Sequence, residues 1–139
     1  MSELDEGKLI EAARRVRELS VAPFSNFKVG AAVETEDGKI YTGCNIESAS
    51  YGLTVCAERV AIWKALSEGE RRFKGLAVVT GTEQLTPPCG TCRQIIWEFC
   101  RDTTVVLANL NGDSQTVRMS ELLPRAFDAR FLKEATREK

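Results

Sequence analysis

The sequence predicts an α/β protein: a three-layer α-β-α sandwich in which helices cover both faces of a five-stranded mixed sheet. Apolar residues follow helical and strand periods alternately along the chain. Two turns, Asp37-Gly38 and Asn111-Gly112, are of the kind that joins antiparallel strands. The chain has 139 residues, 43% of them hydrophobic, and no linker or repeat. We therefore predict that residues 1–139 form a single domain with its own core.

The first half of the chain predicts a helix, a β-hairpin and a second helix. Residues 4–19 carry apolar side chains on one face and charged side chains on the other. Residues 28–34 alternate as a strand does, and residues 39–44 form the returning strand of the hairpin. After a loop over residues 48–55, residues 56–68 are apolar on most sides, which predicts a buried helix.

The second half predicts three strands and two helices. Residues 76–79 form a continuous apolar run, which is typical of a strand buried on both faces. Residues 90–99 predict a second buried helix, and residues 103–108 and 115–119 predict a second hairpin. The tail from residue 128 is charged and predicts a helix. Helices that alternate with strands, flanked by hairpins, favour a mixed sheet covered on both faces.

Composition excludes several classes of protein. The chain has 19 Lys and Arg against 20 Asp and Glu, whereas proteins that bind nucleic acid usually carry a basic excess. It has no histidine, which excludes Ser–His and Cys–His nucleophilic pairs and histidine metal ligands. No run approaches the roughly 18 apolar residues of a membrane span. The acidic first residues lack an apolar signal core, so we expect a cytoplasmic protein with reduced thiols.

Two short motifs carry the chemistry, Cys-Ala-Glu-Arg at residues 56–59 and Pro-Cys-Gly-Thr-Cys at residues 88–92. Both lie at predicted helix starts, where free N–H groups and the helix dipole favour thiolates. If the two helix starts face each other, Cys56, Cys89 and Cys92 bind one metal ion and leave one tetrahedral position open, as catalytic zinc sites do. Glu58 would then exchange protons with a zinc-activated water, and Arg59 would hydrogen-bond the sulfurs.

Other interpretations of these residues stay open on the sequence alone. The Cys-x-x-Cys pair could be a redox pair, Cys56 a small buried residue and Glu58 a solvated helix charge. A structural zinc module that binds a partner protein is a further alternative. It requires a fourth ligand, which Cys44 or Cys100 would supply, and it leaves Glu58 without a role.

Five segments together resemble the cytidine deaminases of the small, three-cysteine, homotetrameric type. The pairing of a Cys-x-Glu motif with Pro-Cys-x-x-Cys is the zinc-deaminase signature in its three-cysteine form. The resemblance spans nearly the whole chain and implies the fold expected above. The segments are Phe24 to Ala32, Gly43 to Glu47, Cys56 to Arg59, Pro88 to Gln94 and Leu122 to Phe127.

The resemblance implies hydrolytic deamination of cytidine and 2′-deoxycytidine to uridine and 2′-deoxyuridine plus ammonia, in pyrimidine salvage. One Zn²⁺ per subunit would be held by Cys56, Cys89 and Cys92, and zinc-bound hydroxide would attack C4 with Glu58 as proton shuttle. Arg59 would tune the thiolates. The implied substrate contacts are the Ala57 backbone N–H and Phe24 on the base, Asn45 and Glu47 on the sugar, and Tyr51 and Phe127 reaching a neighbouring subunit's pocket.

The substrate is the least constrained part of this hypothesis. A carboxylate such as Glu47 near the ribose would repel a 5′-phosphate, which favours a free nucleoside over a nucleotide or a nucleic acid. A zinc deaminase of another small substrate, such as blasticidin S, is the alternative. Trp63 and Trp97 are larger than the resemblance leads us to expect, so acceptance of N4-modified pyrimidine nucleosides is left open.

Overall fold

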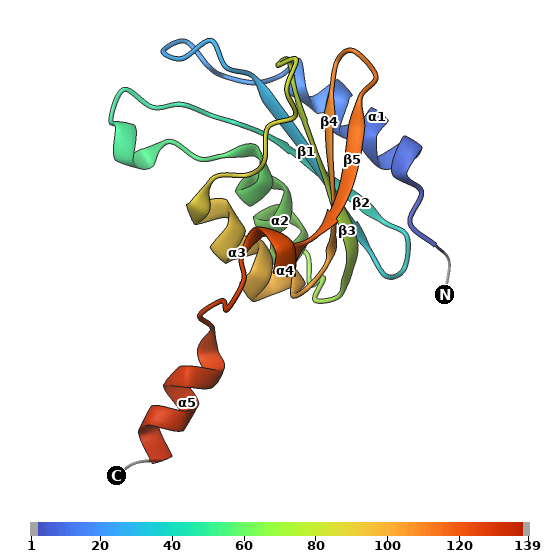
Figure 1. Cartoon of the computed structure of the whole chain (residues 1–139). Helices are drawn as coiled ribbons and strands as arrows, with labels where there is room; N and C mark the ends of the chain where they lie inside the picture. Colours follow the sequence, from blue (N-terminus) through green and yellow to red (C-terminus); the bar gives the residue numbers. More distant parts are fainter. Residues whose placement is uncertain (1–2, 138–139) are drawn as a thin grey trace.

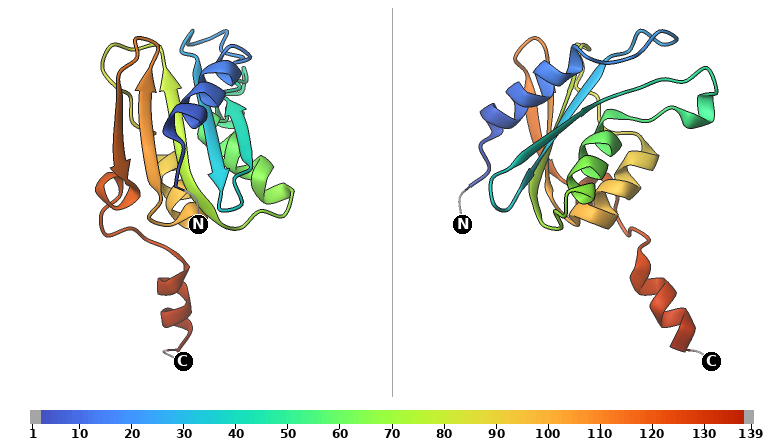
Figure 2. Two further views of the ribbon diagram at one scale, coloured as in Figure 1. Left: turned by 90° about the vertical axis from the view of Figure 1, so that its right-hand side faces the viewer. Right: turned by 180° about the vertical axis from the view of Figure 1, so that it is seen from behind.

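The computed structural model describes residues 3–137 and contains one five-stranded sheet between layers of helices (Figures 1 and 2). The strand order is β2-β1-β3-β4-β5. Strands β3 and β4 are parallel, and the other neighbouring pairs are antiparallel, so the sheet is mixed, as predicted. The strands are β1 (Val29–Thr35), β2 (Ile40–Cys44), β3 (Phe73–Thr80), β4 (Thr104–Asn109) and β5 (Ser114–Arg118).

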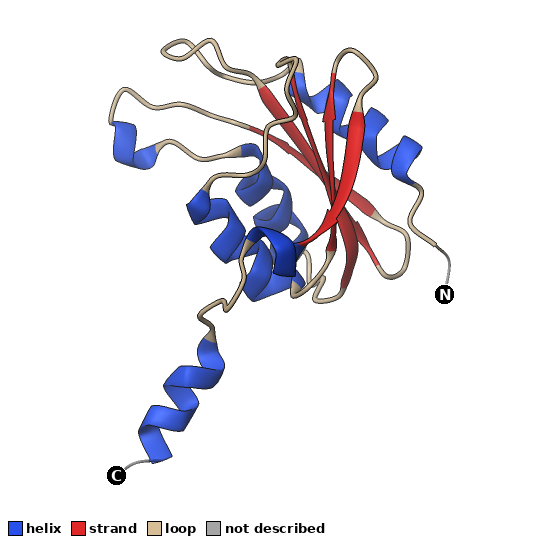
Figure 3. Ribbon diagram, viewed as in Figure 1, coloured by secondary structure: helices blue, strands red, loops and turns tan. Residues whose placement is uncertain are grey.

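Helices cover both faces of this sheet, which confirms the predicted sandwich (Figure 3). Helix α1 (Glu6–Arg17) packs on one face, and α2 (Ala57–Ser67) and α3 (Gly90–Cys100) lie side by side on the other (Figure 2). The remaining helices are η1 (Tyr51–Leu53), α4 (Met119–Leu122) and α5 (Ala129–Arg137). Among residues 3–137, no helix has the length and apolar character needed to cross a membrane.

Successive residues of the central strands supply two separate cores, because strand side chains point alternately to opposite faces. On β3, Leu76 and Val78 pack toward α2 and α3, whereas Ala77 and Val79 pack toward α1. Strands β1 and β4 follow the same alternation. All four of these β3 side chains are buried, in agreement with the prediction of a strand covered on both faces.

Strand β2 and helix α2 approach each other backbone to backbone at Gly43. A Cβ atom added at Gly43 would lie 2.5 Å from the Ala61 nitrogen and 2.6 Å from the Ala57 carbonyl oxygen. Only glycine permits this approach. The contact fixes the first turn of α2 relative to the sheet, and that turn follows Cys56 and contains Glu58.

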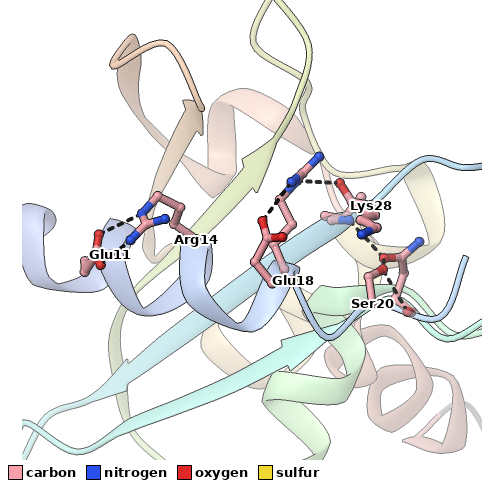
Figure 4. Close-up of polar contacts among 8 residues, drawn as sticks. Glu11, Arg14, Glu18, Ser20 and Lys28 are labelled. Carbon is pink, nitrogen blue, oxygen red and sulfur yellow. Dashed lines mark hydrogen bonds and ion pairs between the residues drawn. The ribbon is translucent and has the colours of Figure 1, made fainter.

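Side-chain hydrogen bonds connect the end of α1 to the residue before β1, and the segment after α1 to the residue that follows β2 (Figure 4). The Arg17 guanidinium donates to the Lys28 carbonyl oxygen over 3.1 Å. The Ser20 hydroxyl donates to both the side-chain and backbone oxygens of Asn45. On the exposed face of α1, the Glu11–Arg14 ion pair (Figure 4) lies in solvent and adds little stability.

Helix α2 departs from its predicted burial on one side. Ala57, Glu58, Ala61, Ile62 and Ala65 are buried, but the Trp63 side chain is 44% exposed. Helix α5 likewise leaves its apolar side chains uncovered and projects away from the body of the molecule (Figure 1). A helix that is apolar on most sides was expected to be wholly buried, and one chain provides only the sheet and α3 to cover it.

The close approach at Gly43 leads to a prediction about stability. Gly43→Ala should lower the free energy of unfolding by about 1–3 kcal/mol, because the methyl group overlaps the α2 backbone. Urea denaturation measures the change. Gly52→Ala is the control, since a Cβ there meets nothing within 4 Å. Equal stability of the two variants would show that α2 is not held to β2 by this approach.

Candidate active site

Several of the site candidates line a cavity of about 310 Å³ where the N-termini of α2 and α3 meet the end of β3. This volume is at the lower end of the range of small-molecule sites. The lining residues come from the segment before β1, the segment after β2, and the starts of α2 and α3. They are Ser25, Phe27, Val29, Asn45, Glu47, Thr54, Val55, Cys56, Ala57, Glu58, Val78, Thr80, Thr86, Pro87 and Cys89.

Three cysteine sulfurs meet beside this cavity. The Sγ atoms of Cys56, Cys89 and Cys92 all lie within 4.8 Å of one another, and those of Cys56 and Cys89 are 3.9 Å apart. Tetrahedral zinc with Zn–S bonds of about 2.3 Å places two sulfurs about 3.8 Å apart. The group therefore fits zinc with little movement. Within residues 3–137, Cys44 and Cys100 lie outside the group, so neither supplies the fourth ligand that a closed structural site requires.

Two of the three cysteines lie at helix N-termini. Cys56 is the N-cap of α2 and Cys89 is the N-cap of α3, and neither end has a side-chain cap hydrogen bond. The free N–H groups of each first turn stabilise negative charge on the adjacent sulfur. The hydrogen bond from Cys92 and the neighbouring Arg59 guanidinium lower the pKa of the Cys56 thiol to about 5. The same hydrogen bond, with burial, raises the pKa of Cys92.

Arg59 lies beside the sulfur group, as the sequence predicts. Its Nη2 atom donates to the Cys56 Sγ atom over 3.5 Å, and this contact raises the pKa of the guanidinium. Its Cζ atom lies 5.7 Å from the centre of the Trp63 ring. Arg59 thus places a positive charge beside the Cys56 sulfur.

Glu58 is a buried carboxyl group that lines the cavity but does not belong to the sulfur group. The residue is only 4% exposed. Burial, and to a smaller extent the Cys56 thiolate, raises the pKa of Glu58 to about 7. A carboxyl group with such a pKa can both accept and release a proton near neutral pH, which is the property a general acid–base requires.

Asn45 and Glu47 both line the cavity and are already hydrogen-bonded within the chain. The Asn45 side chain donates to the Phe27 carbonyl oxygen (2.7 Å) and accepts from the Val29 N–H (2.9 Å). Glu47 accepts from the Ser25 hydroxyl and from the N–H groups of Phe24 (3.0 Å) and Ser25. The bonds from Ser25 and Phe24 hold the pKa of Glu47 below its usual value. Asn45 therefore orders the cavity wall, and Glu47 presents an ionised carboxylate to the cavity.

Phe24, which was predicted to pack on the base, lies outside the cavity, as do Tyr51 and Phe127, which were predicted to reach a neighbouring subunit's pocket. Phe24 and Tyr51 line a neighbouring surface hollow, where their rings meet edge to face with centres 5.9 Å apart. Phe127 is exposed and stacks on Phe131. Phe27, which was not among the predicted substrate contacts, lines the cavity instead. Phe27 lies in the same Phe-Ser-Asn-Phe segment as Phe24, but the sequence does not reveal which of the two rings faces the cavity.

Comparisons with known proteins agree on one family. Residues 4–108 match the cytidine and deoxycytidylate deaminase zinc-binding region. A cytidine deaminase of Sporosarcina psychrophila is 48% identical over 136 residues, covering 97% of this chain and 100% of that protein. One of Halalkalibacterium halodurans is 52% identical over 127 residues, covering 91% and 96%. The crystal structure of a cytidine deaminase from Burkholderia pseudomallei is 49% identical with a TM-score of 0.86, covering 89% of this chain and 100% of that one.

The arrangement of the three sulfurs leads to a prediction about zinc binding. Cys89→Ser should reduce bound zinc from about one ion per chain to well below one, because hydroxyl oxygen is a poor replacement for a thiolate ligand. Metal analysis after dialysis against a chelator measures the loss. Cys44→Ser is the matched control, since Cys44 lies outside the group, and it should keep its zinc. Zinc retention by Cys89→Ser, or zinc loss by the control, would contradict this ligand set.

Proposed function

The chain belongs to the cytidine and deoxycytidylate deaminase family, and on that basis we propose that it hydrolyses cytidine and 2′-deoxycytidine to uridine and 2′-deoxyuridine with release of ammonia. One observation carries the proposal: a buried carboxyl group outside the sulfur group lines a cavity together with two of the three cysteines whose sulfurs fit zinc. A redox pair or a closed structural zinc site would leave Glu58 without a purpose. A hydrolytic zinc site requires a group of this kind.

In this function Cys56, Cys89 and Cys92 would hold one Zn²⁺ per subunit, and the ion would supply the Lewis acidity that lowers the pKa of a water molecule toward about 7. Glu58 accepts a proton from that water and delivers it to N3 of the pyrimidine, and C4 gains the oxygen. Glu58 then moves the second proton to the departing amino group, so that ammonia leaves and the uracil carbonyl forms. Its pKa of about 7 suits both directions of transfer.

The cavity wall supplies the remaining substrate contacts. Phe27 packs against the pyrimidine, and the Ala57 N–H, in the first turn of α2, donates to the base oxygen O2. Glu47 accepts hydrogen bonds from the sugar hydroxyls, with Asn45 beside it. Phe24 acts at the rim and not on the base, because it lines the outer hollow. The residues that line the cavity include no Lys or Arg, which favours an uncharged nucleoside over a nucleotide.

The exposed aromatic and aliphatic side chains support a homotetramer in which neighbouring subunits complete each active site. Phe127, Phe131 and Leu132 are each about half exposed on or beside the projecting helix α5, and Tyr51 is 76% exposed at the cavity rim. A cluster of exposed large apolar side chains, such as the stacked rings of Phe127 and Phe131, marks an interaction surface. In this proposal Tyr51 and Phe127 reach a neighbour's pocket, and residues 1–139 are one deaminase domain that acts in cytoplasmic pyrimidine salvage.

Glu58 gives the direct test of the chemistry. Glu58→Gln should lower kcat for cytidine by about 10²–10⁴-fold, because an amide of the same shape cannot transfer a proton. The loss of cytidine absorbance measures the rate, and metal analysis should find unchanged zinc. Glu68→Gln, an exposed carboxylate at the other end of α2, is the matched control. A zinc-loaded Glu58→Gln variant within tenfold of the wild-type rate would contradict the proposed role.

The same assay separates the substrates. We expect conversion of cytidine and 2′-deoxycytidine but not of cytidine 5′-monophosphate or blasticidin S. Glu47→Gln should raise KM for cytidine about tenfold to a hundredfold with a smaller change in kcat, since one charged acceptor is lost. Ser25→Ala, which keeps the carboxylate and removes one of its donors, should change KM less. If the folded, zinc-loaded protein converts only blasticidin S, then blasticidin S and not cytidine is its substrate.

A further inference from the structure

The Arg59 guanidinium is weakly held by hydrogen bonds, although it carries the compensating charge of the metal site. Its Nη2 atom donates to the Cys56 sulfur at 3.5 Å, which is a long contact to a soft acceptor. Its Nε atom is buried and has no hydrogen-bond partner among the described residues. Arginine has many rotamers, and fixing one of them costs entropy. Something else must therefore hold this side chain at the sulfur.

Trp63 is placed to do this. It lies four residues after Arg59 on α2, and side chains with this spacing share one helix face. Helical side chains lean toward the N-terminus, so the Trp63 ring covers the turn that carries Arg59. The Arg59 Cζ atom lies 5.7 Å from the ring centre, within the range of a cation–π contact, and tryptophan is the strongest of the aromatic partners.

We propose that Trp63 is a positioning residue that holds the Arg59 guanidinium beside the Cys56 sulfur and so sets how much negative charge the three thiolates donate to the metal. Without the indole ring, Arg59 would spend part of its time away from the sulfur. The thiolates would then be richer donors, and the metal would be a weaker Lewis acid.

Substitution with cobalt(II) tests the proposal without substrate. Thiolate-to-cobalt charge transfer absorbs in the near ultraviolet, and a richer sulfur donor moves the band to longer wavelength. Trp63→Leu should shift the band to longer wavelength, and Trp63→Phe should shift it less, following the strength of the cation–π contact. In an Arg59→Ala background, Trp63→Leu should cause no further shift, because the cation that the ring positions is gone.

In the zinc enzyme the same substitution should lower kcat about two- to fivefold, the factor expected from a half-exposed cation–π contact, with KM unchanged. Sedimentation of each variant shows whether assembly has changed. An unchanged cobalt band in Trp63→Leu would overturn the proposal. So would an equal shift with and without Arg59, which would assign Trp63 to packing or subunit contact. The inference rests on the proposed zinc site, but the band is independent of substrate, so failure to deaminate cytidine would be distinguishable from failure of the Trp63 role.

Discussion

The parallel pairing of β3 with β4 is the constraint on which the site depends. Helix α2 leads into β3, and α3 leads from β3 into β4, with both helices on the same face of the sheet. Two helices that each precede one of two parallel strands must begin at the same edge, where the strands end. Cys56 and Cys89 are the N-caps of these helices, so the topology itself brings the sulfurs together. Gly43 then sets the height of α2 above the sheet.

Charge balance is the second requirement that this arrangement meets. Three cysteine sulfurs and the Glu58 carboxyl group share a small region, where Arg59, the partial charges of the helix N-termini and a bound metal ion would supply the compensating positive charge. Glu58 responds to its surroundings by a raised pKa and Cys56 by a lowered one, although the two residues are neighbours in sequence. Burial is the main cause of the raised pKa of Glu58, and hydrogen bonds are the main cause of the lowered pKa of Cys56. The same few residues thus give a cysteine thiol a pKa of about 5 and a carboxyl group a pKa of about 7.

Residue periodicity predicted the strands and helices to within a few positions, because both sheet faces are covered and the patterns are strong. The cysteine spacing likewise indicated the sulfur group. The sequence could not distinguish Phe24 from Phe27, because both lie in one loop segment without a regular period, and only the structure shows that Phe27 lines the cavity and Phe24 the outer hollow. The partial exposure of Trp63 depends on how much of α2 one chain can cover, and residue patterns do not reveal that.

The hydrogen bonds of Asn45 bear on how this protein can evolve. Its amide connects the segment after α1, the residues before β1 and the end of β2, so most replacements would weaken the fold before they altered substrate choice. Selection for new substrates therefore has little freedom at this wall of the cavity. The Phe24 and Tyr51 rings contact each other and are exposed in the isolated chain, so their replacement should affect folding less. We expect substitutions that change the substrate range to occur at Phe24 and Tyr51 more often than at Asn45.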